Sequence, residues 1–141
     1  MLGRWFLKLF VALHVGVYRL TGGAIGGQTR GLPVLLLTTS GRKSRRQRTV
    51  PLLYFRDGAG YVITASNGGA DRHPAWFLNL QSNPQARVQV AGFLKQVVAE
   101  QANPAEKQRL WGQLVAQAPF YEEYQKRTRR EIPMVILRPV S

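Results

Sequence analysis

Two short β-prone runs on either side of Asp57-Gly58-Ala59-Gly60 constrain the fold more than any other feature of this 141-residue chain. Residues 49–56 precede the turn and residues 61–66 follow it, and an Asp-Gly turn between two such runs predicts an antiparallel hairpin. A second hairpin is predicted from residues 86–90 and 94–99, which meet at Ala91-Gly92-Phe93. Because tight turns join neighbouring antiparallel strands, a parallel sheet built from βαβ units is not expected.

The remaining elements complete an α+β pattern. Residues 32–39 and 133–137 predict two further strands, and helices are predicted to begin at Pro74, Pro104 and Pro119, since proline suits the first position of a helix. The sum is about six mainly antiparallel strands with peripheral helices, which favours a barrel. No Gly-rich fingerprint opens a helix after a strand, so a dinucleotide-binding Rossmann site is not supported.

The chain is strongly basic, and its charged residues are unevenly distributed along the sequence. The chain has 20 Lys and Arg against seven Asp and Glu, a formal net charge of +13, and no carboxylate precedes Asp57. Such a field predicts an anionic partner: a phosphate, a polycarboxylate, nucleic acid or an acidic membrane.

The N-terminal segment 2–20 is apolar and aromatic and predicts an amphipathic helix, with Arg4, Lys8 and Arg19 along one stripe. It is too charged for a comfortable membrane span and lacks the cleavage site of a secretory signal. Two interpretations remain: a helix packed on the domain, or a membrane-interface anchor. We therefore divide the chain into this helix, residues 1–21, and one barrel domain, residues 22–141.

The sequence contains few residues that could carry hydrolytic, thiol or metal chemistry. The chain has no cysteine and only two histidines, His14 and His73, and its two aspartates are Asp57 and Asp71. Asp57 belongs to the hairpin turn, and Asp71 and His73 lie in the loop before a predicted helix. A catalytic triad or a metal site is therefore not expected.

Three local features are candidates for binding. The basic stretch 41–48 suits a phosphate or carboxylate, although a solvated loop or a nucleic-acid contact has the same composition. The absence of aromatic residues within the stretch weighs against single-stranded nucleic acid. Residues 65–69 combine small side chains that let a flat ligand approach the backbone, or form a simple glycine turn. The third feature is an aromatic cluster on one predicted helix: Phe120, Tyr121 and Tyr124.

Six motifs in this order resemble the deazaflavin-dependent nitroreductase family of actinobacteria, whose members use coenzyme F420 on a split β-barrel. The similarity runs from about Gly22 to the C-terminus, and the motifs are Gly26-Gly27-Gln28-Thr29-Arg30-Gly31, Thr38-Thr39-Ser40-Gly41-Arg42-Lys43-Ser44, Pro51-Leu52-Leu53-Tyr54, Ala65-Ser66-Asn67-Gly68-Gly69, His73-Pro74-Ala75-Trp76-Phe77-Leu78-Asn79-Leu80 and Asn83-Pro84. Each motif is weak alone, but six in register are specific to the family.

The resemblance implies a ligand that matches the charge, since the coenzyme joins a flat tricyclic ring to a phosphodiester and a polyglutamate tail. It implies that the phosphate and tail contact Arg42, Lys43, Ser44 and Arg48. The ring is expected to lie against Thr49, Val50, Pro51, Leu52, Leu53, Thr64, Ala65, Ser66 and Asn67, with Ala75, Trp76, Phe77, Leu78 and Asn79 on the other side. The residues expected at the reaction itself are Ser66, Tyr121 and Tyr124, of which Tyr121 also contacts the cofactor.

The implied activity is hydride transfer from reduced coenzyme F420 to a small lipophilic acceptor such as a quinone or a nitro compound. Leu53 and Ala118 replace tyrosines of the member that reduces bicyclic nitroimidazoles, which argues against that substrate, and Arg45 replaces a common glycine. The alternatives are a flavin mononucleotide or haem-like ligand on the same barrel, and a non-catalytic barrel that binds lipid or nucleic acid. The predicted location is the cytoplasm, with peripheral attachment to the inner face of the membrane as the finer prediction.

Overall fold

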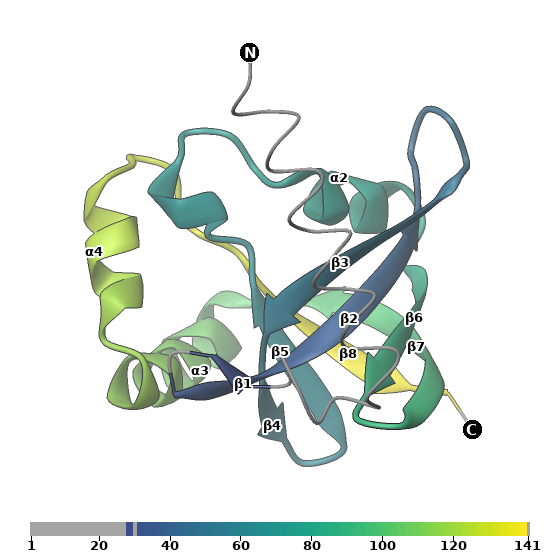
Figure 1. The fold of residues 1–141 in the computed structure, drawn as a ribbon. Coiled ribbons are helices and arrows are strands. Elements are labelled where there is room, and N and C mark those ends of the chain that lie inside the picture. The colour runs from purple at the N-terminus through teal and green to yellow at the C-terminus, as the bar shows by residue number, and fades with distance from the viewer. Residues whose placement is uncertain (1–27, 30, 141) are drawn as a thin grey trace.

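A computed structural model of the chain describes residues 28, 29 and 31–140 (Figure 1). The strands are β1 (Gln28–Thr29), β2 (Leu32–Ser40), β3 (Gln47–Leu53), β4 (Phe55–Asp57), β5 (Gly60–Thr64), β6 (Gln85–Val90), β7 (Phe93–Gln101) and β8 (Met134–Pro139). The helices are the short 3-10 helix η1 (Asn67–Gly69), α2 (Ala75–Ser82), α3 (Pro104–Gln117) and α4 (Phe120–Lys126). The expected α+β architecture is confirmed.

The strands form one curled antiparallel sheet in the order β1-β2-β6-β7-β8-β5-β4, and β3 pairs with β2 off this path. Both predicted hairpins form, with Asp57 opposite Gly60 in the first and Val90 opposite Phe93 in the second. This arrangement confirms the split-barrel fold.

The strand predicted over residues 49–56 is the main correction to the sequence analysis, because the structure divides it at Tyr54. The part before Tyr54 is β3, which pairs with β2, and only the short β4 after it pairs with β5. At the break, the Tyr54 backbone N–H donates to the Pro33 carbonyl at 3.0 Å. Because of this division, the two halves of one β-prone run pair with two different strands, β2 and β5.

Alternating side chains of β5 and β8 separate two apolar clusters. Tyr61 and Ile63 face the cluster shared with Trp76 and Phe77, whereas Val62 faces the cluster shared with α3 and α4. Since successive strand residues point to opposite faces, the sheet supports a barrel interior on one side and a helical layer on the other. Each fully buried large aliphatic side chain contributes about 1.5–3 kcal/mol to folding.

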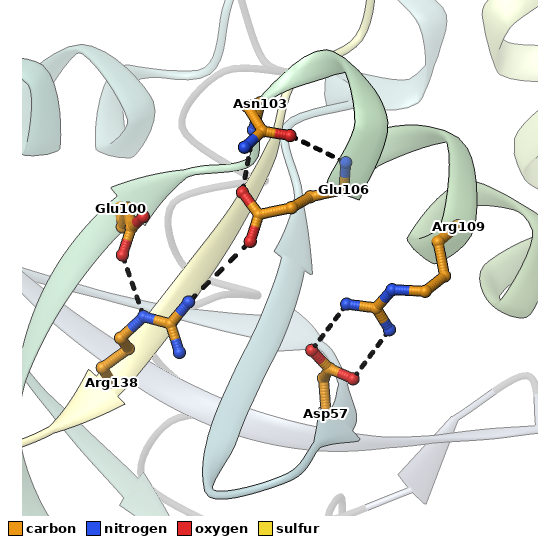
Figure 2. A network of polar contacts seen from close by, with 6 residues as sticks. All are labelled: Asp57, Glu100, Asn103, Glu106, Arg109 and Arg138. Atoms are coloured by element: carbon orange, nitrogen blue, oxygen red, sulfur yellow. Dashed lines mark hydrogen bonds and ion pairs between the residues drawn. The ribbon is translucent and has the colours of Figure 1, made fainter.

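Polar contacts fix α3 to the strands beside it (Figure 2). The helix begins with a capping box, in which Asn103 Oδ1 accepts from the Glu106 N–H at 2.8 Å and Glu106 Oε1 accepts from the Asn103 N–H at 3.1 Å. Arg109 makes a two-pronged contact with Asp57 at 3.0 and 3.1 Å, and Arg138 on β8 lies 3.9 Å from Glu106. These contacts hold α3, and the α4 that follows it, against the sheet.

The predicted N-terminal helix over residues 2–20 and the glycine-rich connection after it lie outside the described residues. The division of the chain at residue 21 therefore stays a prediction. Among the helices that the structure describes, none is long and apolar enough to cross a membrane.

Candidate functional site

Two adjoining cavities form an extended groove along α2. The smaller, of about 370 Å³, is lined by Thr39, Gly41, Arg42, Lys43, Ser44, Arg48, Val50, Ala75, Trp76 and Asn79. The larger, of about 910 Å³, is lined by Val50, Pro51, Leu52, Leu53, Thr64, Ser66, Asn67, Gly68, Arg72, His73, Pro74, Ala75, Trp76, Phe120, Tyr121 and Tyr124. Since Val50, Ala75 and Trp76 line both, the two cavities adjoin one another.

The turn between β2 and β3 forms the basic end of the groove, beside α2 (Figure 1). The turn is closed by the Gly41 N–H, which donates to the Arg46 carbonyl at 2.8 Å, and by the Arg45 N–H, which donates to the Gly41 carbonyl at 2.8 Å. A Cβ on Gly41 would lie 2.7 Å from Ser44 Oγ, so a larger residue would displace that hydroxyl. Arg45 has a φ of 60°, a left-handed conformation that suits the glycine expected at this position.

The side-chain amide of Asn79 on α2 holds this turn through two hydrogen bonds. Its Oδ1 accepts from the Arg42 backbone N–H at 3.0 Å, and its Nδ2 donates to Thr39 Oγ1 at 3.0 Å. Asn79 and Thr39 are both buried, so neither polar group has an easy substitute in water. The amide therefore connects the start of the basic turn to the helix along the groove.

The side chains of the basic end carry uncompensated positive charge. Arg42, Lys43 and Arg48 are exposed and line the smaller cavity, to which no carboxylate contributes. Within the described part of the chain, none of the three forms an ion pair with an Asp or Glu. An anion that entered this cavity would meet two-pronged guanidinium donors and an ammonium group.

Aromatic side chains of α4 form a wall of the larger cavity. Phe120 stacks on Tyr121 with ring centroids 4.6 Å apart, and Tyr124 contacts both rings edge-on at 5.5 and 5.6 Å. Tyr121 is buried in the cluster beneath α3 and α4, whereas Tyr124 is partly buried. The wall therefore combines a fixed apolar surface with phenol groups.

The loop after β5 forms the facing wall and depends on glycine. A Cβ on Gly69 would lie 2.7 Å from the Tyr124 carbonyl oxygen, and the residue has a φ of 85°. Only glycine therefore lets η1 pack this closely against α4. Arg127, directly after the end of α4, donates to the Gly68 carbonyl at 3.3 Å, which adds a polar contact between the two walls.

Arg130 holds the same loop through its guanidinium group. Its Nε donates to the Ala70 carbonyl at 2.9 Å, Nη1 to the Ala65 carbonyl at 3.2 Å and Nη2 to the Ser66 carbonyl at 2.9 Å. Nη1 also lies 3.2 Å from Nδ1 of His73. Burial, and then the Arg130 charge, lower the pKa of His73 below its ordinary value, so this imidazole is neutral near pH 7.

Most of the residues expected at the site line the groove. Those that do are Arg42, Lys43, Ser44, Arg48, Val50, Pro51, Leu52, Leu53, Thr64, Ser66, Asn67, Ala75, Trp76, Asn79, Tyr121 and Tyr124. Four do not: Phe77 and Ala65 lie in the core, Leu78 packs against it, and Thr49 contacts the Thr38 hydroxyl at 2.8 Å.

The groove also contains residues that were not among the expected ligand contacts. Gly41, Gly68 and Phe120 belong to the three candidate binding features of the sequence analysis, whereas Thr39, Arg72, His73 and Pro74 were not singled out for binding. Thr39, His73 and Pro74 lie within the quoted motifs, but Arg72 and Arg130, which contacts His73, do not. In the described residues no cluster of three or more His, Asp or Glu side chains is arranged for a metal ion.

The chain matches the F420H2-dependent quinone reductase family over residues 10–139. An F420H2-dependent quinone reductase of Mycobacterium tuberculosis is 43% identical over 130 residues, which cover 89% of this chain and 87% of that protein. A solved F420-H2 dependent reductase is 36% identical with a TM-score of 0.68, covering 74% of this chain and 93% of its own. Another solved structure, described as a domain-swapped dimer, is 30% identical with a TM-score of 0.71, covering 97% and 99%.

Proposed function

The chain belongs to the F420H2-dependent quinone reductase family, and from this membership we propose that its groove holds reduced coenzyme F420 beside a quinone that accepts hydride. The observation that carries this proposal is that the two cavities adjoin, with Val50, Ala75 and Trp76 in the wall of both. One end offers unpaired cations to an anionic tail, and the other offers strand backbone, small loop residues and aromatic rings to a flat heterocycle. A ligand that is anionic at one end and planar at the other fits both ends at once.

The residues of the groove divide between the two parts of such a ligand. Arg42, Lys43, Ser44 and Arg48 would hold the phosphate and carboxylates through charge-assisted hydrogen bonds. Residues 50–53 of β3, together with Thr64, Ser66 and Asn67, would support the ring from one side, and Ala75 and Trp76 on α2 would cover the junction with the tail. The exposed basic end therefore supplies affinity, and the apolar end supplies orientation.

When bound, the reduced deazaflavin supplies a hydride, and the protein contributes position and a low-dielectric surrounding. A quinone that takes up a hydride and a proton becomes a hydroquinone, so its carbonyl oxygens need hydrogen-bond donors. Tyr121 and Tyr124 carry phenol groups in the cavity wall, and Ser66 carries a hydroxyl in the opposite loop. We assign the orientation of the acceptor to these three side chains.

The apolar N-terminal segment bears on where the protein encounters a lipophilic quinone. Arg4, Lys8 and Arg19 lie on one stripe of residues 2–20, which is the pattern of a helix at an anionic interface. We propose that this segment brings the protein to the membrane surface. A chain lacking residues 2–20 should sediment less with vesicles of phosphatidylglycerol than the full chain, with unchanged coenzyme affinity, and equal sedimentation would refute this role.

The proposed cofactor is tested by fluorescence titration of the full chain. Oxidised coenzyme F420 should bind and its fluorescence should change on binding, whereas flavin mononucleotide and nicotinamide cofactors should not compete. Reduced coenzyme should then be consumed in the presence of a naphthoquinone, with one hydroquinone formed for each coenzyme oxidised. Stable retention of flavin mononucleotide without coenzyme F420 binding would assign the groove to a flavin instead.

A further inference from the structure

His73 and Arg130 are in contact at the apolar end of the groove. The geometry of this contact determines which ring nitrogen of His73 carries the proton. Arg130 Nη1 lies 3.2 Å from His73 Nδ1, and a guanidinium group can only donate hydrogen bonds. Nδ1 must therefore be the acceptor. In a neutral imidazole the proton then resides on the other nitrogen, Nε2.

The guanidinium group cannot easily turn away from this contact. Three of its four remaining N–H groups donate to the carbonyls of Ala65, Ser66 and Ala70, which lie on the loop that forms one wall of the larger cavity. The imidazole also packs against Phe77, whose ring centroid lies 4.8 Å away. Both members of the pair are thus fixed by neighbours that belong to the core or to the cavity wall.

The Nε2–H of His73 is available to a ligand. His73 lines the larger cavity, and within the described part of the chain no protein group accepts a hydrogen bond from Nε2. The structure also contains no buried side-chain nitrogen or oxygen without a partner among the described residues, so Nε2 reaches solvent. Burial and then the Arg130 charge lower the pKa of His73 and favour the uncharged imidazole, while the carboxylate of Asp71 accepts from the Thr128 hydroxyl at 2.8 Å.

We propose that Arg130 fixes His73 as the neutral tautomer protonated on Nε2, and that this N–H donates a hydrogen bond to a carbonyl oxygen of the ligand in the larger cavity. The inference rests on the proposed function for the identity of that ligand, which offers two sources: a ring carbonyl of the coenzyme or a carbonyl of the quinone. At the quinone, a fixed donor stabilises the negative charge that develops on oxygen as the hydride is accepted. At the coenzyme, the same donor would orient the ring from which the hydride leaves. His73 is then a catalytic residue, and Arg130 is its positioning residue.

The tautomer is measured directly by nitrogen NMR on protein with ¹⁵N-labelled histidine. The chain has only two histidines, so the variant His14→Gln leaves His73 as the single signal. We expect an unprotonated Nδ1 and a protonated Nε2 at pH 7, with a pKa below the ordinary histidine value. The variant Arg130→Met should lose this preference while remaining folded by circular dichroism, whereas the matched variant Arg129→Met should keep it. A wild-type ring protonated on Nδ1 would overturn the proposal.

The ligand's identity is tested by adding oxidised coenzyme F420 alone and then together with 2-methyl-1,4-naphthoquinone, a pair that does not react. A shift of the Nε2–H signal with the coenzyme alone assigns the bond to the ring, and a shift only after the quinone assigns it to the acceptor. No shift in either case overturns the proposal. Absence of coenzyme binding would instead refute the proposed function, while the tautomer of the free protein would be unaffected.

Two isosteric substitutions separate donation into the cavity from support of Arg130. His73→Gln places an amide N–H near the position of Nε2, whereas His73→Asn places its amide near Nδ1 and keeps only the Arg130 contact. We expect His73→Asn to lower kcat/KM for the quinone about 100-fold, the cost of one lost donor to a developing oxyanion. His73→Gln should retain at least tenfold more activity than His73→Asn, and equal losses or a more active Asn variant would overturn the proposal.

Discussion

Asn79→Leu should destabilise the protein and weaken coenzyme binding through one mechanism, the loss of the contact between α2 and the basic turn. Leucine keeps the volume but removes both hydrogen bonds of the amide. Thr39, only 2% exposed, is then left with a buried hydroxyl lacking its partner, which costs about 1–3 kcal/mol. The Arg42 N–H lies in an exposed turn where water can replace the amide, so its loss adds about 0.5–1 kcal/mol.

The free energy of unfolding should therefore fall by about 1.5–4 kcal/mol, measured by urea titration with an unchanged m-value. The affinity for oxidised coenzyme F420 should fall about tenfold, because the turn that presents Arg42 loses its anchor. Thr39→Val supplies the control: removing the hydroxyl together with the amide should cost at least about 1 kcal/mol less than the sum of the single changes. A strictly additive cycle, or an Asn79→Leu variant as stable as the wild type, would refute this reasoning.

Three further predictions follow from other parts of the structure. Replacing Arg42 and Lys43 with Ala should lower coenzyme affinity about 10–100-fold at low salt, whereas replacing Arg45 and Arg46, which lie in the same turn but outside the cavity lining, should change it far less in the same titration. Tyr121→Phe and Tyr124→Phe should lower quinone turnover, by about 10–1000-fold where the phenol assists proton transfer, with coenzyme affinity nearly unchanged; wild-type turnover in both would remove these hydroxyls from the reaction. The hydrogen bond from Arg109 holds the pKa of Asp57 below 3.8, so its stabilising contribution is present above that pH and is lost as the pH falls through the lowered value. Urea unfolding should accordingly show wild type more stable than Asp57→Asn at pH 7, with a gap that narrows at pH 3.

Turn chemistry and proline positions predicted most of the fold. The turns at Asp57–Gly60 and Ala91-Gly92 and the helices beginning near Pro74, Pro104 and Pro119 all depend on local conformational preferences, which the sequence displays directly. The break at Tyr54 could not be predicted in this way. The residues before Tyr54 pair with β2 and those after it pair with β5. This difference in pairing partner is a tertiary property that the local sequence of the run does not show.

The basic end of the groove could also be predicted from the sequence, because its cations Arg42, Lys43 and Arg48 lie in one short stretch of the chain. Arg130 was not, since nothing local distinguishes it from the other arginines of the chain. Its importance comes from three carbonyls and an imidazole nitrogen that lie about 60 residues earlier in the chain. Because most partners of Arg130 are backbone carbonyls, which every residue type carries, no particular residue type in the sequence marks these contacts.

The helix α2 explains which members of the expected contiguous stretch 75–79 belong to the groove. Ala75, Trp76 and Asn79 are spaced i, i+1 and i+4, so one helix face presents them together, whereas Phe77 and Leu80 occupy the buried face. The same helix carries Asn79 beside the basic end of the groove and follows His73 at the apolar end. Because one residue of helix corresponds to about 100° of rotation, a single insertion between Phe77 and Asn79 would turn Asn79 away from Thr39 and keep Phe77 against His73. It would therefore uncouple the basic turn while leaving His73 beside Arg130, so the two ends of the groove can be separated by one change in register.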